Sequence, residues 1–100
     1  MEKGKPHYDL AAMQQVIAEI GIDAFTQTAL QGGLEMELTD SEMLDVVAGL
    51  TRREFYKSMT TYVDHRIWQD VYHAPCPNGL VAYIKLTQVA ERIVIQFKEL

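Results

Sequence analysis

The sequence predicts an α+β fold, in which N-terminal helices pack on one face of a mainly antiparallel β-sheet formed by the C-terminal half. Three observations carry this prediction. Apolar residues recur at helical spacing behind helix-capping residues in the first half of the chain. The second half is rich in β-branched and aromatic residues that alternate with polar ones. The length of 100 residues, 48% of them hydrophobic and 23% charged, fits a single domain over residues 1–100.

The first predicted helix begins after Asp9, whose side chain can cap it, and ends at Gly21. Four apolar residues between these two recur at intervals of three or four and share one face of the helix. They are Leu10, Met13, Ile17 and Ile20. A second helix is expected over residues 25–31, where Gly32-Gly33 interrupts it.

Two capping boxes, each a threonine followed three residues later by a glutamate, mark further helix starts. Thr39 and Glu42 open a helix with one apolar face, made of Met43, Val46, Val47 and Leu50. Thr51 and Glu54 open a short helix that runs toward Lys57.

Three strands are predicted in the second half, over residues 66–72, 80–89 and 92–98. A loop over residues 74–79, with two prolines and a glycine, separates the first strand from the second. Ala90-Glu91 provides a tight turn between the second and the third. Helices followed by such a meander indicate a helical layer on one face of the sheet.

Strand alternation assigns the side chains to faces. The wholly apolar sets of the last two strands must face the helices, and they are Leu80, Ala82, Ile84, Leu86, Ile93, Ile95 and Phe97. The opposite face then displays Tyr83, Lys85, Gln96 and Lys98. The strand over residues 66–72 is ambiguous, and Gln69 joins the polar face only if Trp68 and Tyr72 are buried.

Charge is distributed unevenly along the chain. Residues 1–50 have a net charge of −7 and residues 51–100 a net charge of +2, which together give −5. A basic surface for nucleic acid therefore has to come from the second half. The N-terminus lacks the apolar run of a signal peptide, no stretch is long enough to cross a membrane, and the single Cys76 makes no internal disulfide. We expect a cytoplasmic protein without metal or cofactor.

The most informative stretch is FYKSMTTYVDHRIWQDVY, residues 55–72. It crowds aromatic side chains together with a lysine, a histidine and a glutamine, which is unusual for ordinary core. Surfaces of this kind can stack bases and bind phosphate.

The strings FYKSMTTY and DHRIWQDVY, followed by Tyr83-Ile84-Lys85 and by VIQFKE over residues 94–99, closely resemble the MqsR family (motility quorum-sensing regulator). The resemblance covers nearly the full chain and is strongest from residue 54 on. It implies a RelE-like fold and the activity of an mRNA interferase, an endoribonuclease that cuts single-stranded messenger RNA and favours GC-containing triplets. It also implies a toxin–antitoxin pair with a cognate MqsA-like antitoxin that binds zinc and DNA.

Carried over position by position, the resemblance implies a set of functional residues, namely Lys57, Gln69, Tyr83 and Lys98, with Tyr56 and Met59 beside them. His7 and Lys85 complete the expected substrate-binding set. Strand alternation reaches Tyr83 and Lys98 independently, and Gln69 on the condition given above.

Cleavage of RNA without metal uses the 2′-hydroxyl of the substrate as nucleophile, so it needs proton transfer and cations around the phosphate. We expect Tyr83 to transfer protons, Lys57 to stabilise the phosphate charge and Lys98 to add a second cation. Gln69 would orient the substrate, while Tyr56 and Met59 would flank the bases.

Two alternatives stay open. His65 lies in the informative stretch, so a histidine-based ribonuclease is conceivable, although a hydrogen bond within a turn is the simpler role for it. The chain as a whole is acidic, which favours a catalytically weak or dead toxin-like protein that acts in transcriptional regulation with its antitoxin. In either case, an antitoxin strand could add to a free edge of the sheet.

Overall fold

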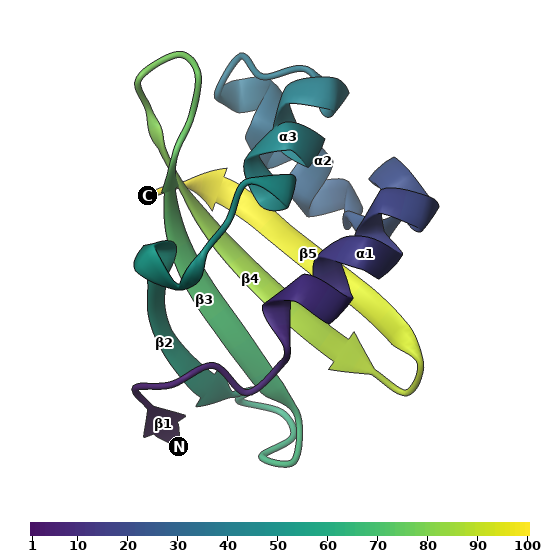
Figure 1. The fold of residues 1–100 in the computed structure, drawn as a ribbon, viewed down its shortest axis with the longest axis vertical. Coiled ribbons are helices and arrows are strands. Elements are labelled where there is room, and N and C mark those ends of the chain that lie inside the picture. Colours follow the sequence, from purple (N-terminus) through teal and green to yellow (C-terminus); the bar gives the residue numbers. More distant parts are fainter.

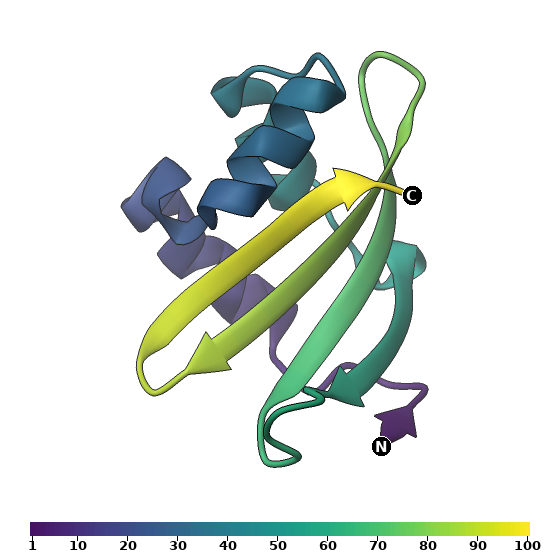
Figure 2. The same cartoon turned by 180° about the vertical axis from the view of Figure 1, so that it is seen from behind.

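The computed structural model describes residues 1–100 and places the helices on one side of a five-stranded antiparallel sheet with the order β1-β2-β3-β4-β5 (Figure 1). The strands are β1 (Glu2–Lys3), β2 (Phe55–Thr60), β3 (Trp68–Pro75), β4 (Val81–Val89) and β5 (Arg92–Glu99). The helices are α1 (Leu10–Ile20), α2 (Gln27–Glu35) and α3 (Asp40–Ala48), with 3₁₀ turns η1 (Gly21–Ala24) and η2 (Arg52–Glu54). Seen from behind, the other face of the sheet carries no helix (Figure 2). The predicted α+β fold is confirmed.

Local capping signals determine where α1 and α3 begin. The Asp9 side chain accepts a hydrogen bond of 3.1 Å from the Ala12 backbone, and Gly21 ends α1 with a φ of 72°, which favours glycine. Thr39 and Glu42 form both hydrogen bonds of the predicted capping box at the start of α3. None of the helices has the length and apolarity needed to cross a membrane.

The core lies between the helices and the face of the sheet that strand alternation assigned to them. The buried apolar side chains of β4 and β5 are Ala82, Ile84, Leu86, Ile93, Ile95 and Phe97. On the neighbouring strand β3, Tyr72 is buried on the same face and Trp68 is half-buried there, so Gln69 lies on the opposite, polar face. The predicted faces of β4 and β5 are therefore confirmed.

The predicted end of α2 at Gly32-Gly33 is wrong, because the helix continues through both glycines to Glu35. A Cβ built on Gly32 would collide with the carbonyl oxygen of Phe97 in β5. The absence of a side chain thus lets the backbone of α2 lie directly against β5. Here close packing outweighs the weak helix propensity of glycine.

Replacing Gly32 by alanine should lower the free energy of unfolding by about 1–3 kcal/mol, since an added methyl group has no room against fixed backbone. Gly33→Ala should cost less, because its Cβ meets only the flexible side chain of Met43. Gly4→Ala, with nothing within 4 Å of the new methyl group, is the matched control. Urea denaturation of the three variants measures this, and a Gly32→Ala protein as stable as wild type would contradict the packing argument.

The segment before the informative stretch also differs from its prediction. Thr51 and Glu54 form the predicted capping box, but the helix is a single 3₁₀ turn, and the chain enters β2 at Phe55. Lys57 therefore lies on a strand and pairs with Val71, next to an irregularity between residues 55 and 57. Pairing with β3, distant in sequence, outweighs the local helical signal.

The first predicted strand is shifted along the chain. Residues 61–67 form a closed loop, in which the Asp64 backbone donates to Thr61 Oγ1 and Asp64 Oδ1 accepts from Arg66. The strand β3 consequently begins at Trp68 and continues to Pro75. His73, which the prediction left outside the strand, is part of the sheet.

Asp70 ties the N-terminal segment to the sheet. Its carboxylate is 1% exposed and accepts hydrogen bonds from the backbone N–H groups of His7 and Tyr8, at 3.0 and 2.9 Å, and from Ser58 Oγ at 2.6 Å. The chain is thus fixed shortly after β1, whose two residues pair with Ser58 and Met59 of β2.

Alkaline pH should weaken the fold through Tyr72. Burial, and then the nearby Asp70 charge, raises the pKa of the Tyr72 phenol from 10.0 to about 12. The unfolded chain releases this proton above pH 10, while the folded protein keeps it. The contribution of the Tyr72 phenol to the free energy of unfolding is therefore complete below pH 10 and falls as the pH rises toward 12. The loss in the free energy of unfolding from this group is about 2 kcal/mol at pH 12. We expect Tyr72→Phe to lose correspondingly less stability than wild type between pH 9 and pH 12 in urea titrations; identical losses would rule out this contribution.

Candidate active site

The face of the sheet without helices (Figure 2) is here called the open face. The register of the strands places most of the predicted functional residues on it. Alternation along β2 to β5, with the observed register, places fifteen side chains on it. These are Lys57, Met59, Gln69, Val71, His73, Pro75, Val81, Tyr83, Lys85, Thr87, Val89, Arg92, Val94, Gln96 and Lys98. Residues up to 41 positions apart in the chain thus form one continuous surface.

Lys57 lies near the β1 side of the open face. Its Nζ is 2.9 Å from a carboxylate oxygen of Glu2 in β1, and the Lys57 side chain is 29% exposed. The hydrogen bond to Glu2 holds the pKa of Lys57 above its usual value. Lys57 is therefore a protonated cation, which suits the stabilisation of phosphate charge and not the role of a base.

Tyr83 lies between two lysines toward the β5 side of the open face. The Nζ atoms of Lys98 and Lys85 are 5.4 Å and 5.8 Å from the centre of its ring. Burial, and then the positive charge of Lys98, lowers the pKa of Lys85. A hollow of about 340 Å³ beside these three residues is walled by Thr26 and Thr28 at the start of α2. Neither lysine has an acidic partner, so an anion can be neutralised here.

Gln69 is flanked on the open face by Met59 of β2 and Thr87 of β4. The Gln69 amide makes no hydrogen bond within the protein, so both its donor and its acceptor are free for a ligand. The Oγ1 atom of Thr87 is buried and also lacks a partner. This row thus provides unused hydrogen-bonding capacity beside the lysines.

Strand prediction missed one open-face residue, His73. Its ring stacks on Tyr56 with 4.3 Å between the ring centres and an angle of 19° between the planes. It also lies opposite Tyr83 in the register, with 5.6 Å between ring centres. Extending the first predicted strand, residues 66–72, by one residue would have shown His73 to be in phase with Gln69 and Val71.

Two other histidines lie away from the open face. The His7 ring stacks on Trp68 at 5.2 Å, and its Nδ1 is 2.9 Å from Lys3 Nζ. Because Trp68 alternates with Gln69, this cluster is on the helical side of the sheet, apart from Lys57 and Tyr83. His65 is exposed in the loop and makes no hydrogen bond there, since Asp64 holds the turn instead. The expected turn hydrogen bond of His65 is therefore wrong.

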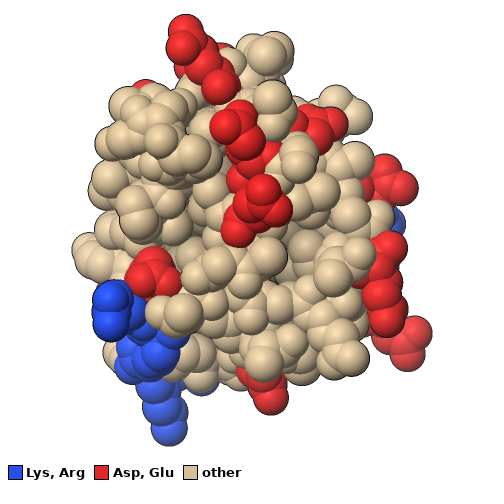
Figure 3. Space-filling model, turned by 45° about the horizontal axis from the view of Figure 1, so that its top comes forward, with Lys and Arg blue, Asp and Glu red and all other residues tan.

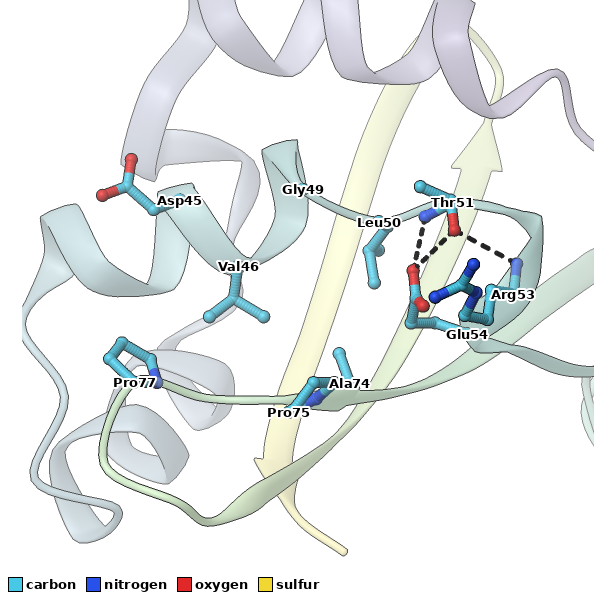
Figure 4. Close-up of a pocket in the computed structure, with 10 residues that line it drawn as sticks. All are labelled: Asp45, Val46, Gly49, Leu50, Thr51, Arg53, Glu54, Ala74, Pro75 and Pro77. Atoms are coloured by element: carbon cyan, nitrogen blue, oxygen red, sulfur yellow. Dashed lines mark hydrogen bonds between the residues drawn. The ribbon is translucent and has the colours of Figure 1, made fainter.

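A hollow of about 520 Å³ lies elsewhere, between α3, η2 and the loop after β3 (Figure 4). Two of its polar side chains already bind each other and the local backbone: Glu54 accepts from the backbone and the hydroxyl of Thr51, and that hydroxyl accepts from the Arg53 backbone. They hold the η2 turn and are not free for a ligand. No group of three or more His, Cys, Asp or Glu side chains converges anywhere in the protein.

The two sides of the molecule differ in charge. Acidic side chains spread over the helical side, while basic ones gather at one corner of the same view (Figure 3). The open face carries the cations Lys57, Lys85, Arg92 and Lys98, and Glu2, which pairs with the open-face Met59 in the register, is bound to Lys57. The net charge of −5 therefore does not describe the surface on which the candidate residues lie.

Comparison with known proteins identifies the family. The family model described as "Motility quorum-sensing regulator, toxin of MqsA" matches residues 5–99. The chain belongs to the MqsR toxin family. It is 40% identical over 99 residues to the "mRNA interferase toxin MqsR" of Escherichia coli (strain K12), and the match covers 99% of each chain. The resemblance stated from the sequence is thus confirmed, and the predicted class of enzyme agrees with the name of this MqsR relative. The description of the MqsR family also implies an antitoxin partner.

Proposed function

We propose that this member of the MqsR family is a cytoplasmic, metal-independent endoribonuclease that cleaves single-stranded messenger RNA. The observation that supports this best is the position of Lys57, Gln69, Tyr83 and Lys98 together on the open face, which no helix covers. An exposed sheet surface with cations and aromatic rings suits an extended single strand better than a folded small molecule.

The chemistry uses groups that the open face supplies. The 2′-oxygen of the RNA attacks the adjacent phosphorus, a 2′-O–P bond forms and the bond to the 5′-oxygen breaks. The products are a 2′,3′-cyclic phosphate and a free 5′-hydroxyl, with no further reactant. Tyr83 transfers protons, Lys57 and Lys98 neutralise the charge that builds up on the phosphate, and Lys85 adds a further cation.

Substrate orientation is assigned to the remaining polar and aromatic residues. Gln69 holds the substrate through its unused amide, and Tyr56 and Met59 flank the bases. Tyr56 is 56% exposed, so one side of its ring is open to stacking although the other rests on His73. The preference for GC-containing triplets is proposed from the resemblance to the MqsR family. His7 stays a proposed RNA contact, on the other side of the sheet.

The proposed partner is an MqsA-like antitoxin that binds zinc and DNA and blocks the toxin by adding a strand to an edge of the sheet. Both edges leave backbone groups unpaired. β1 covers only two residues of β2. The outer side of β5 is partly covered, where Phe25 and Thr26 meet Ile95 and where α2 packs against Phe97 through Gly32. An extended antitoxin segment can use these free groups.

The test is cleavage of a ribosome-free messenger RNA by the purified protein in EDTA, with analysis of the RNA ends. We expect cleavage that leaves 2′,3′-cyclic phosphates, and none in an oligonucleotide of 2′-deoxynucleotides. Cleavage that EDTA abolishes, or products with 5′-phosphates, would refute the proposed reaction. An absence of cleavage even with ribosomes would support the catalytically dead, regulatory alternative instead. Eight of the fourteen acidic residues lie in residues 9–45, which hold the three helices, and acidic side chains spread over the helical side in Figure 3.

A further inference from the structure

His73 occupies the centre of an aromatic row on the open face. Tyr56, from the start of β2, stacks on one part of the imidazole at 4.3 Å, and Tyr83, from β4, leans against it at 5.6 Å with an interplanar angle of 39°. Three rings from three strands are thus in contact. The row joins a residue proposed to flank the bases with the residue proposed to transfer protons.

The imidazole contributes its ring and not its hydrogen bonds. It makes no hydrogen bond to any protein group, and its Nε2 atom is buried without a partner. A buried polar atom in this state destabilises the free protein by roughly 1–3 kcal/mol. What the side chain provides in return is a rigid, planar contact with both tyrosines.

Two lysines of the open face lie beside the same tyrosine rings. Lys57 Nζ is 5.6 Å from the centre of the Tyr56 ring, and Lys98 Nζ is 5.4 Å from that of Tyr83. A change in the tilt of either ring would therefore shift the aromatic surface relative to the charge that binds phosphate. On the open face, the His73 ring lies between the two tyrosine rings and sets the distance between them.

We propose that His73 is a positioning residue: its ring supports Tyr56 as a platform for an RNA base and holds Tyr83 in the orientation for proton transfer. A base stacked on Tyr56 is thereby set at a fixed distance from the Tyr83 hydroxyl and the lysines. This inference rests on the proposed ribonuclease function and adds to it a residue that acts through its two neighbours.

The test compares His73→Phe, which keeps a planar ring, with His73→Ala, which removes it. In steady-state cleavage of a single-stranded oligoribonucleotide, His73→Ala should lower kcat about 10- to 100-fold, because small misplacements of reacting groups are costly. It should also raise KM about tenfold, through weaker base stacking. His73→Phe should stay within about threefold of wild type in both constants, since it removes no hydrogen bond. His65→Ala, a histidine exposed in the loop, is the matched control.

Two results would overturn the proposal. Wild-type kinetics in a folded His73→Ala protein would mean that the ring is not needed. Equal impairment of His73→Phe and His73→Ala would mean that the nitrogen atoms act and the ring does not.

Binding separates this proposal from the ribonuclease activity itself. If wild type cleaves no RNA, the proposed function fails, but the support of Tyr56 can still be measured with an uncleavable, fully 2′-O-methylated oligonucleotide. His73→Ala should then bind it about tenfold more weakly than wild type, and His73→Phe should bind it equally well. Unchanged binding in His73→Ala would overturn the positioning role.

Discussion

Cleavage of single-stranded RNA should fall at least about 100-fold when Lys57 is replaced by alanine or Tyr83 by phenylalanine. This corresponds to a loss of about 2.7 kcal/mol of transition-state stabilisation. Lys57 is held as a cation by Glu2, and its ammonium group is the one on the β2 side that can offset charge on the phosphate. Its removal leaves Glu2 without a partner, which adds repulsion toward RNA.

Tyr83→Phe isolates the hydroxyl group, because the phenylalanine ring keeps the contact with His73 and the neighbouring lysines. A loss of kcat with little change in KM would assign the hydroxyl to the chemical step. Steady-state cleavage with purified protein gives kcat and KM for both variants, after circular dichroism has shown that each is folded. Lys5→Ala, which removes an exposed lysine between β1 and α1, is the matched control and should cleave normally. Near-normal cleavage by both the Lys57 and the Tyr83 variants would refute this placement of the active site.

Loss of the Asp70 carboxylate should destabilise the fold more than any other single change considered above. Asp70→Ala leaves the backbone donors of His7 and Tyr8 and the hydroxyl of Ser58 without their acceptor. Hydrogen bonds to a charged group contribute about 1.5–3 kcal/mol each, and they are not additive, so we expect a loss of about 3–5 kcal/mol in the free energy of unfolding. That is a large share of the stability of a domain of this size.

The loss of Asp70 should also loosen the N-terminal segment, whose Glu2 binds Lys57 in the candidate active site. Without Asp70, the N-terminal segment loses its attachment, and the amides of His7 and Tyr8 should exchange with solvent much faster. Asp70→Asn, which keeps the volume and one acceptor oxygen, should lose less stability than Asp70→Ala. Urea denaturation and amide exchange measure these effects, with the exposed Asp45→Ala as control, expected within about 0.5 kcal/mol of wild type. An Asp70→Ala protein as stable as this control would show that Asp70 does not anchor the segment.

Sequence patterns worked wherever the signal and its effect lie within a few residues. The caps at Asp9 and Thr39 predicted the starts of α1 and α3, because a cap bonds to backbone only three residues away. The alternation in residues 80–98 predicted which side chains of β4 and β5 are buried, since period two leaves a single choice once one face is apolar. The same alternation placed Tyr83 and Lys98 on the open face.

The predictions that were wrong concern segments whose structure depends on residues far away in the sequence. The helix expected to run toward Lys57 gave way to β2, because Lys57 pairs with Val71 in the sheet. The glycines expected to stop α2 instead admit Phe97, which lies 65 residues further along the chain. Both outcomes depend on contacts with distant segments, and no pattern within a short window reports them.

The sequence by itself therefore determined the α+β architecture, the family and four of the residues on the open face, because caps, alternation and motif strings are local. Tertiary structure alone decided that Glu2 binds Lys57 across 55 positions, that Asp70 holds the N-terminal segment, and that His73 separates two tyrosines. In each of these cases the energy comes from pairing groups that only the sheet brings together. The chemistry of the open face depends on such pairs, and so it becomes visible only in the folded protein.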